Sequence, residues 1–261
     1  MDFDFSQIAV PFRMQPGLRR IACDGLQLTA LDPQTPLYAQ KQAVLQARQS
    51  RHVLDGFDPQ PALDAIAARS PRSWSDSELP LELAFEEDFA VLDGATTALP
   101  WLCVCLPSHW APEEKLGLPF AALHAPVADN EALLAAGRQL VRLVTSGERF
   151  ERFVWTVSPS GRYDQHPRRH ARTPWPATQD LQAFAEQCFL RAERQTFFPV
   201  AGVSGQAVFT IRVMLRPLVE AVALREDAQR LHAALASMSD AVFAYKGLAP
   251  ARDRLLGWLA A

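Results

Sequence analysis

The sequence predicts an α+β fold in which a half-buried antiparallel sheet has helices on its flanks. Apolar residues at helical spacing concentrate towards the two ends of the chain, whereas most strand-like runs lie in the middle. These runs follow one another through short turn signals, as hairpins do, rather than through helices. This segregation favours α+β over a doubly wound α/β fold. With 261 residues the chain can bury a substantial core, and we expect one domain over residues 1–261.

The first part of the chain is expected to be irregular up to about residue 35 and then largely helical. Apolar spacing predicts a helix over Pro36–Leu54, which Gly56 and Pro59 end, and a further short helix over Ala62–Arg69. The polar stretch Ser70–Pro80 has the composition of a loop.

Strands are expected next. Leu81–Phe85 alternates apolar and acidic residues, and Phe89–Leu92 precedes an Asp93-Gly94 turn, which together suggest a hairpin. The continuous apolar run Trp101–Leu106 is typical of an interior strand. Prolines interrupt Pro107–Pro126, which we expect to be a loop with at most one short helical turn.

The second half of the chain continues with a helix, three strands and closing helices. The predicted elements are a helix over Glu131–Thr145, a strand over Arg152–Val157, a basic surface loop over Arg162–Pro176, a helix over Thr178–Cys188, a hairpin of strands Phe189–Phe198 and Ala207–Arg216, and helices over Val219–Tyr245 and Pro250–Leu259. The Pro199–Gly205 connection suits the hairpin, and Gly247 is expected to stop a helix.

Composition argues against several classes of protein. The net charge is −3 with acids and bases interspersed, whereas general nucleic-acid or anionic-membrane binders carry a strong basic excess. No apolar run approaches the length of a membrane span, and the amino-terminal MDFDFSQIAV has acids where a secretory signal has Lys or Arg. We therefore expect a cytoplasmic protein with no nucleic-acid and no membrane partner.

The cysteines fit that compartment. Cys103 and Cys105 lie two apart in a strand-like run, a poor geometry for a mutual disulfide. Cys23 and Cys188 are isolated, and no C-x-x-C pair or zinc or iron–sulfur ligand spacing occurs in the sequence. All of them are expected to be reduced thiols that behave as small hydrophobic side chains.

Motifs for nucleotide cofactors are missing from the sequence. There is no G-x-G-x-x-G, P-loop, H-E-x-x-H or G-x-S-x-G. No recognisable motif therefore binds NADPH, a flavin or an iron–sulfur cluster in this chain, and any redox chemistry would need electrons from elsewhere.

The predicted strand Phe189–Phe198 carries charges on both faces. Arg191 shares one face with Glu193 and Gln195, while Arg194 lies on the other. Charges in such a strand are costly unless they are paired or face a ligand. The strand is therefore either part of a ligand site or an edge strand with solvated arginines. In the next strand, Arg212 is either a clamp for a carboxylate or exposed to solvent.

Two histidines lie in the proline-punctuated segment, His109 in PSHW and His124 in ALHAP. Either side chain is a candidate metal ligand, or it donates a hydrogen bond to the backbone. The cluster from His166 to His170 (HPRRH) lies in a charged loop and is expected to be solvated surface.

Four stretches of the chain together resemble a known family. They are PSHWAPEEKLGLPFAALHAPV (107–127), ERFVWTV (151–157), FLRAERQTF (189–197) and AVFTIRVMLRPL (207–218). Their sequence, order and spacing resemble the heme-dependent oxidative N-demethylase family, specifically its heme-carrying α subunit, over roughly residues 8–248.

The resemblance implies a b-type heme on a PAS-like scaffold with helical amino- and carboxy-terminal extensions. It also implies an oxidoreductase of the monooxygenase kind, which uses O₂ to remove a methyl group from a small amine and releases formaldehyde. Electrons would come from NADPH through a separate flavin and iron–sulfur reductase. The ligands implied for this chain are thus heme, O₂ and a small methylated amine.

Carried over to this sequence, the A-x-H-x-P-V match makes His124 the expected axial ligand of the iron, with His109 as the alternative. Arg191, Arg194 and Arg212 become candidates for clamping heme propionates or polarising bound O₂. Glu193 is the carboxylate expected to hold a cationic amine, and Trp155 is expected to be pocket wall.

Two other functions are compatible with the same resemblance. The chain could be a non-catalytic heme or gas sensor, or heme-binding protein, on the same scaffold. It could also be a PAS-like protein that has lost heme and only binds partners. A sensor usually has an output domain or coiled coil, and the sequence after Trp258 holds none, which favours the enzyme.

Overall fold

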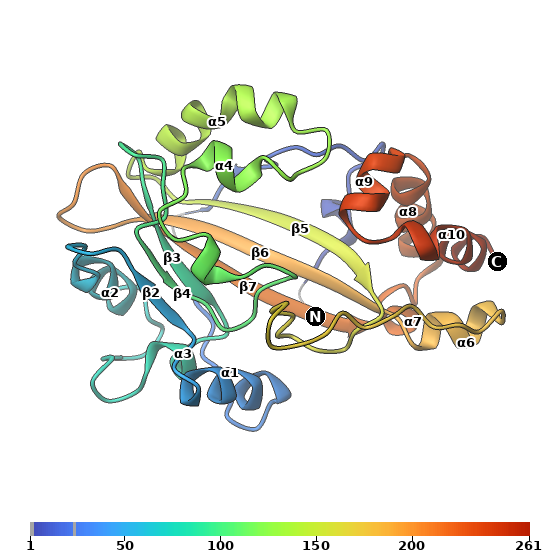
Figure 1. The fold of residues 1–261 in the computed structure, drawn as a ribbon, viewed down its shortest axis with the longest axis horizontal. Helices are drawn as coiled ribbons and strands as arrows, with labels where there is room; N and C mark the ends of the chain where they lie inside the picture. Colours follow the sequence, from blue (N-terminus) through green and yellow to red (C-terminus); the bar gives the residue numbers. More distant parts are fainter. Residues whose placement is uncertain (1–2, 23–24) are drawn as a thin grey trace.

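A seven-stranded antiparallel sheet organises the computed structural model of the protein, which describes residues 3–22 and 25–261 (Figure 1). The strand order is β1-β5-β6-β7-β3-β4-β2. The strands are β1 (Arg19–Arg20), β2 (Arg51–Val53), β3 (Asp88–Asp93), β4 (Trp101–Cys103), β5 (Phe150–Ser158), β6 (Phe189–Pro199) and β7 (Gln206–Pro217). The predicted α+β class, with an antiparallel sheet and flanking helices, is confirmed.

The helices fall before, between and after the strands. They are α1 (Pro36–Gln46), α2 (Gln60–Ala67), α3 (Leu81–Ala84), α4 (Phe120–His124), α5 (Glu131–Val144), α6 (Leu181–Glu186), α7 (Leu218–Ala221), α8 (Arg225–Ala236), α9 (Asp240–Tyr245) and α10 (Arg252–Ala260), with 3-10 turns at Phe5–Gln7, Pro112–Glu114 and Ala249–Ala251. Within the described ranges, no helix is long and apolar enough to cross a membrane.

The long hairpin β6–β7 is the centre of the sheet. Its register pairs Thr196 with Thr210, whose hydroxyls are 2.7 Å apart, and β5 pairs along β6 from Phe150 to Ser158. The predicted hairpin and the strand before it are confirmed, with slightly longer bounds. Because β6 lies between β5 and β7, the interpretation of β6 as an edge strand with solvated arginines is wrong.

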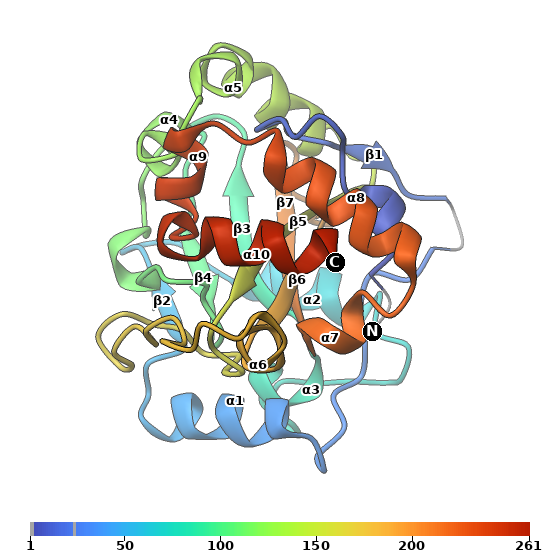
Figure 2. The same ribbon diagram turned by 90° about the vertical axis from the view of Figure 1, so that its right-hand side faces the viewer.

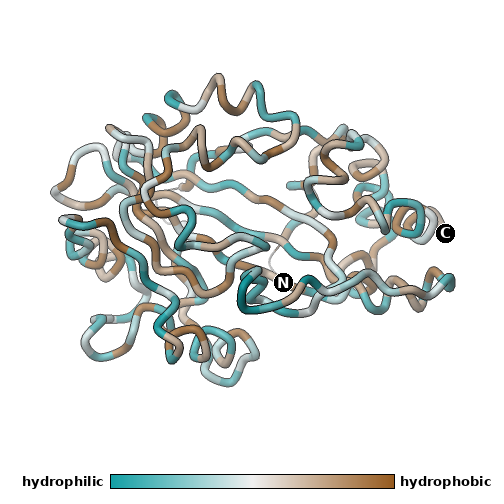
Figure 3. Tube along the Cα trace, viewed as in Figure 1, coloured by the Kyte–Doolittle hydropathy of each residue, from teal (hydrophilic) through white to brown (hydrophobic). Residues whose placement is uncertain are grey.

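The two faces of the sheet have different covers. On one face, α8 and α10 pack against Leu190, Ala192 and Met214, and α2 packs on the neighbouring strands β3 and β7. On the other face, α5 packs Val141 and Val144 against β3 and the end of β6. Figure 2 shows α8, α9 and α10 gathered at one end of the sheet. Hydrophobic and hydrophilic stretches alternate along the long central strands (Figure 3).

Two predictions in the first third of the chain are wrong. The helix predicted over Pro36–Leu54 ends at Gln46, Arg48 takes a positive φ of 55°, and Arg51–Val53 turns into strand β2. The strand predicted over Leu81–Phe85 is instead the short helix α3, so it forms no hairpin with Phe89–Leu92. The latter segment pairs with β4 and β7. The acidic position in that alternation, Glu82, is buried because Arg51 and Ser50 bind its carboxylate.

Two further boundaries differ from those predicted. The segment 107–126 contains two short helical turns, at Pro112–Glu114 and in α4, rather than at most one. The helix predicted over Val219–Tyr245 is broken into α7, α8 and α9. The last break follows from capping, because the hydroxyl of Ser239 accepts a hydrogen bond from the Val242 amide and starts a new helix.

The described cysteines match the predicted thiols. Cys103, Cys105 and Cys188 are free and buried, and burial raises the pKa of each thiol. Cys23 lies outside the described residues.

Candidate functional site

A cavity of about 1500 Å³ lies on the face of the sheet that carries α4 and α5. Its floor consists of side chains from β5, β6 and β7, and its walls come from α4, α5, the segments around residues 108–110 and 172–177, and the end of α9. The volume exceeds the roughly 300–1,000 Å³ of ordinary small-molecule pockets. It therefore has room for a large cofactor and a small ligand together.

The charges around the cavity are unbalanced. Among the described residues that line it, Glu193 is the one carboxylate, whereas the cations are Lys115, Arg152, Arg172, Arg191, Lys246 and Arg254. Apolar side chains from β3, β7, α4 and α5 make up much of the remaining lining. An apolar cavity with a cationic excess suits a flat apolar ligand that carries negative charges.

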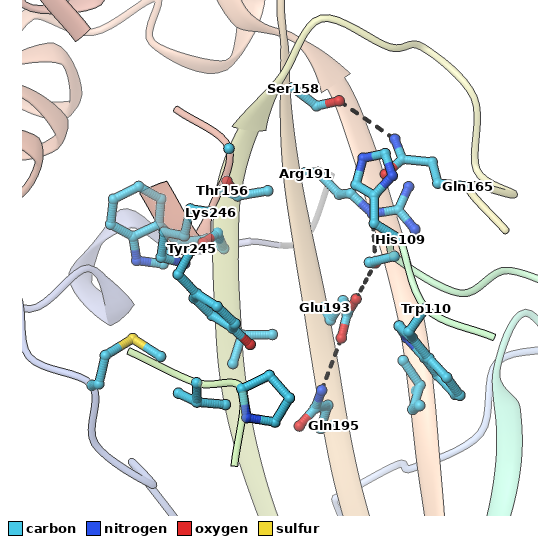
Figure 4. A pocket seen from close by; sticks show the side chains of 18 of the residues that line it. His109, Trp110, Thr156, Ser158, Gln165, Arg191, Glu193, Gln195, Tyr245 and Lys246 are labelled. Carbon is cyan, nitrogen blue, oxygen red and sulfur yellow. Dashed lines mark hydrogen bonds between the residues drawn. The ribbon is translucent and has the colours of Figure 1, made fainter. Parts of the chain in front are cut away.

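Glu193 lies at the centre of the site (Figure 4). Its strand position places it on the same face as Arg191 and Gln195, as the alternation in β6 predicts. The hydroxyl of Ser108 donates a short hydrogen bond to Oε1, and Gln195 Nε2 donates to Oε2 at 2.8 Å. These two donors fix the carboxylate in one orientation towards the cavity. Tyr245 and Trp110 lie on either side of it in the close view.

Arg191 is used mainly to anchor the walls of the site. The side chain is buried, and burial lowers its pKa. Its Nε donates to Ser108 Oγ at 2.8 Å, and its terminal nitrogens donate to three backbone carbonyls, those of Leu106, Arg162 and Tyr163. Through Ser108 it is linked to Glu193. The geometry makes Arg191 a rigid support for the carboxylate and for two loops.

His124 lies at the end of α4 and borders the cavity. Its Nδ1 is 2.8 Å from the Phe120 carbonyl, and its ring stacks on the Phe120 ring with centroids 4.0 Å apart. Because a carbonyl only accepts, Nδ1 carries the proton and Nε2 keeps its lone pair in the neutral imidazole. Burial lowers the pKa of His124, which favours that neutral form. A fixed Nδ1–H, with an Nε2 that has no hydrogen bond to the described residues, is typical of a metal-ligating histidine.

His109 is a second imidazole at the cavity. Its backbone takes a positive φ of 61°, a conformation that residues other than glycine rarely adopt. Burial, with the positive charges of Arg172 and Arg191, lowers its pKa to about 4. It is therefore neutral at ordinary pH. No ring hydrogen bond orients His109 within the described part of the chain, in contrast to His124.

Arg194 and Arg212 lie on the opposite face of the sheet from the cavity. They are cross-strand partners in β6 and β7, where Arg194 binds Glu151 and the Leu26 carbonyl, and Arg212 binds Glu86. The prediction that they clamp heme propionates is therefore not supported by their positions. Their strand parity, opposite to that of Glu193, already separates them from the site.

Trp155 borders the cavity but turns its ring towards the other face of the sheet. The ring lies edge-on to Phe12, at 5.7 Å between centroids. Its carbonyl accepts a hydrogen bond from Lys246 Nζ at 2.8 Å. Burial lowers the pKa of Lys246 to about 8. The main contribution of Trp155 to the cavity is thus its carbonyl, which holds the Lys246 ammonium, rather than the surface of its ring.

The prediction that the HPRRH cluster is solvated surface is wrong for His166, which is buried, whereas Pro167 and Arg168 are exposed as predicted. His166 is 3% exposed, and its Nε2 is 3.1 Å from Glu113 Oε2. Asp164 is only 2% exposed. Two nitrogens of Arg169 donate hydrogen bonds to its carboxylate, which also lies 3.0 Å from His170 Nε2. These contacts fasten the loop after β5 against the segment that carries Ser108 and His109. Ion pairs between distant segments left no pattern in the sequence.

Sequence reasoning also missed several residues at the cavity. Ser108 and Tyr245 lie beside Glu193, and Arg152 reaches the same floor from β5. Alternation within β5 could not assign Arg152 to this face, because only its register with Gln195 places it beside Glu193.

Comparison with known families decides the relationship of the chain. Residues 65–256, most of the sequence, match the family described as haem-dependent oxidative N-demethylase, alpha subunit-like. The chain belongs to this family. The family's name associates it with heme and with oxidative demethylation by a protein of more than one subunit. The match spans β3 to β7, α4 and α5, and so includes most of the cavity.

The residues at the cavity fit a heme. The volume, the apolar lining and the excess of cations suit a porphyrin with two propionates. His124 offers an imidazole with one nitrogen already tied to a carbonyl.

Proposed function

We propose that the chain is the heme-carrying subunit of an O₂-dependent oxidative N-demethylase that acts on a small methylated amine. Each turnover would consume one O₂, two electrons and two protons per methyl group, and would release formaldehyde, water and the demethylated amine. The observation that carries the proposal is Glu193, the one carboxylate among the described residues that line a cationic and apolar cavity, in a chain from this family.

When bound, a b-type heme would supply the activation of O₂ and the oxidising power. The chain's own residues have other tasks. His124 Nε2 would hold the iron, and Glu193 would bind the protonated amine through a charge-assisted hydrogen bond. Ser108 and Gln195 keep that carboxylate in place. Tyr245 and Trp110, on either side of it, would limit the size of the amine.

The electrons would come from a separate protein. The sequence has no motif for NADPH, a flavin or an iron–sulfur cluster, and the family is named for one subunit of a larger enzyme. A flavin and iron–sulfur reductase fed by NADPH is therefore the proposed partner. We further propose that the scaffold is a single heme-binding PAS-like domain with helical extensions at both ends, and that the protein is cytoplasmic.

The direct test is turnover. The purified heme-loaded chain is mixed with a flavin and iron–sulfur reductase, NADPH and dimethylamine, and formaldehyde is measured. Formaldehyde that depends on all of these components supports the proposal. A protein that binds heme and O₂ but forms no formaldehyde with any methylated amine would instead be a sensor or heme-binding protein.

A further inference from the structure

The side chain of Arg152 carries a charge at the cavity floor that no described acid balances. Its Nε is buried and has no hydrogen-bond partner in the described structure. No ion pair joins it to an acid among residues 3–22 and 25–261 either. Buried polar groups nearly always have partners, so an unpaired guanidinium in a cavity indicates a missing acceptor.

Arg152 and Glu193 are near neighbours on the floor. Arg152 is paired with Gln195, and Glu193 lies two residues earlier on β6, so the two side chains are diagonal neighbours on one face. Glu193 attracts Arg152 electrostatically, while burial works against its charge. They do not form a direct ion pair, because Ser108 and Gln195 hold the carboxylate. The floor thus presents a fixed acceptor for a cation beside an unsatisfied donor for an anion.

A heme propionate is a less suitable acceptor for Arg152 than a ligand carboxylate. Propionates are charged and favour the solvent side of a pocket. Arg172, in the loop before α6, is exposed and lines the same cavity. Arg172 is therefore suited to bind a propionate. The buried Nε of Arg152 instead lies beside Glu193, the group proposed to hold the substrate.

We propose that Arg152 and Glu193 form a binding site for an N-methylated amino acid, in which Glu193 takes the ammonium and Arg152 takes the carboxylate. The inference deepens the proposed function and rests on it for the role of Glu193. A guanidinium donates two parallel hydrogen bonds to a carboxylate, a geometry that lysine cannot reproduce. Ligands with both charges should therefore bind more tightly than simple methylated amines.

The test is a binding comparison by isothermal titration calorimetry and by the shift of the heme absorption band. The ligands are N,N-dimethylglycine and dimethylamine, titrated into the heme-loaded chain and into the Arg152→Gln and Arg152→Lys variants. The parent protein should prefer dimethylglycine by on the order of tenfold to a hundredfold. Arg152→Gln should lose that preference through weaker dimethylglycine binding, and should keep its heme content. Arg152→Lys should keep part of it. Arg142→Gln, which removes an exposed arginine of α5, should change nothing.

Several outcomes would overturn the inference. Loss of heme in Arg152→Gln would assign Arg152 to a propionate. Equal affinity of the parent protein for the two ligands would show that Arg152 binds no ligand carboxylate. The proposed function would stand, because dimethylamine would still bind. If neither ligand binds the heme-loaded parent, the amine site at Glu193 fails as well. Should Arg152→Gln not fold, Arg152→Lys decides by the same comparison.

Discussion

Gly137 on α5 controls how closely α4 can approach, and replacing it with alanine should act in two opposite directions. A Cβ at this position would lie 2.8 Å from Phe120 Cδ1 and 3.0 Å from Cε1. Ordinary contacts begin near 3.4 Å, so the ring must retreat by about 0.6 Å, the difference between 3.4 and 2.8 Å. The Phe120 ring stacks on the His124 imidazole, and its carbonyl holds Nδ1. The displacement is therefore passed to the proposed iron ligand.

The magnitudes decide the expected sign. Alanine in a helix interior is favoured over glycine by about 1 kcal/mol, whereas overpacking costs about 1–3 kcal/mol. Gly137→Ala should therefore lower the free energy of unfolding by up to about 2 kcal/mol. Because groups that orient a metal ligand are worth about 10- to 100-fold in affinity, heme binding should weaken by about tenfold.

Gly257 on α10 is the matched control. A Cβ there would meet only Leu181 Cδ1 at 3.4 Å, an ordinary contact, so Gly257→Ala should stabilise by up to about 1 kcal/mol and leave heme affinity unchanged. Urea unfolding of the heme-free proteins and absorbance titrations with heme measure both quantities. The reasoning fails if Gly137→Ala is as stable as Gly257→Ala and binds heme like the parent.

Three further predictions follow from single features of the chain. Glu193→Gln should keep the heme spectrum and weaken amine binding by about 10- to 100-fold, measured by titration, whereas loss of heme would make Glu193 a structural residue. Burial raises the pKa of Glu87 to about 7, and its Oε1 lacks a partner. Between about pH 4.5 and 7, Glu87 is protonated in the folded protein but ionised in the unfolded chain. The free energy of unfolding should therefore fall as pH rises through this range. Glu87→Gln should thus gain stability over the parent between pH 5 and pH 8 in urea unfolding, and a gain that does not change with pH would contradict this. NADPH alone should leave the heme oxidised, while dithionite or an added reductase should reduce it. Rapid reduction by NADPH without a partner would refute the proposed division of labour.

The elements with strong periodicity could be predicted from the sequence. Glu131–Thr145, with apolar residues on one face, forms α5 within one residue, and the alternating strands before and after Pro199–Gly205 form β6 and β7. Strand parity likewise placed Arg191, Glu193 and Gln195 on one face, where the structure has them.

The remaining features depend on contacts between distant segments. Leu81–Ala84 is helical although its residues alternate, because Arg51, thirty-one residues earlier, compensates the buried charge of Glu82. His166 is buried by Glu113 from another loop. Arg152 opens a strand like many others, and its unpaired state becomes visible only once the β5–β6 register is known. No local pattern carries such information.

The central claim is that this cavity binds heme through His124. The most direct measurement compares His124→Ala with His109→Ala, each reconstituted with heme, by heme content and the position of the Soret band. The account predicts loss of heme in His124→Ala, with recovery on adding imidazole, and heme retention in His109→Ala. Full retention in His124→Ala together with loss in His109→Ala would contradict it.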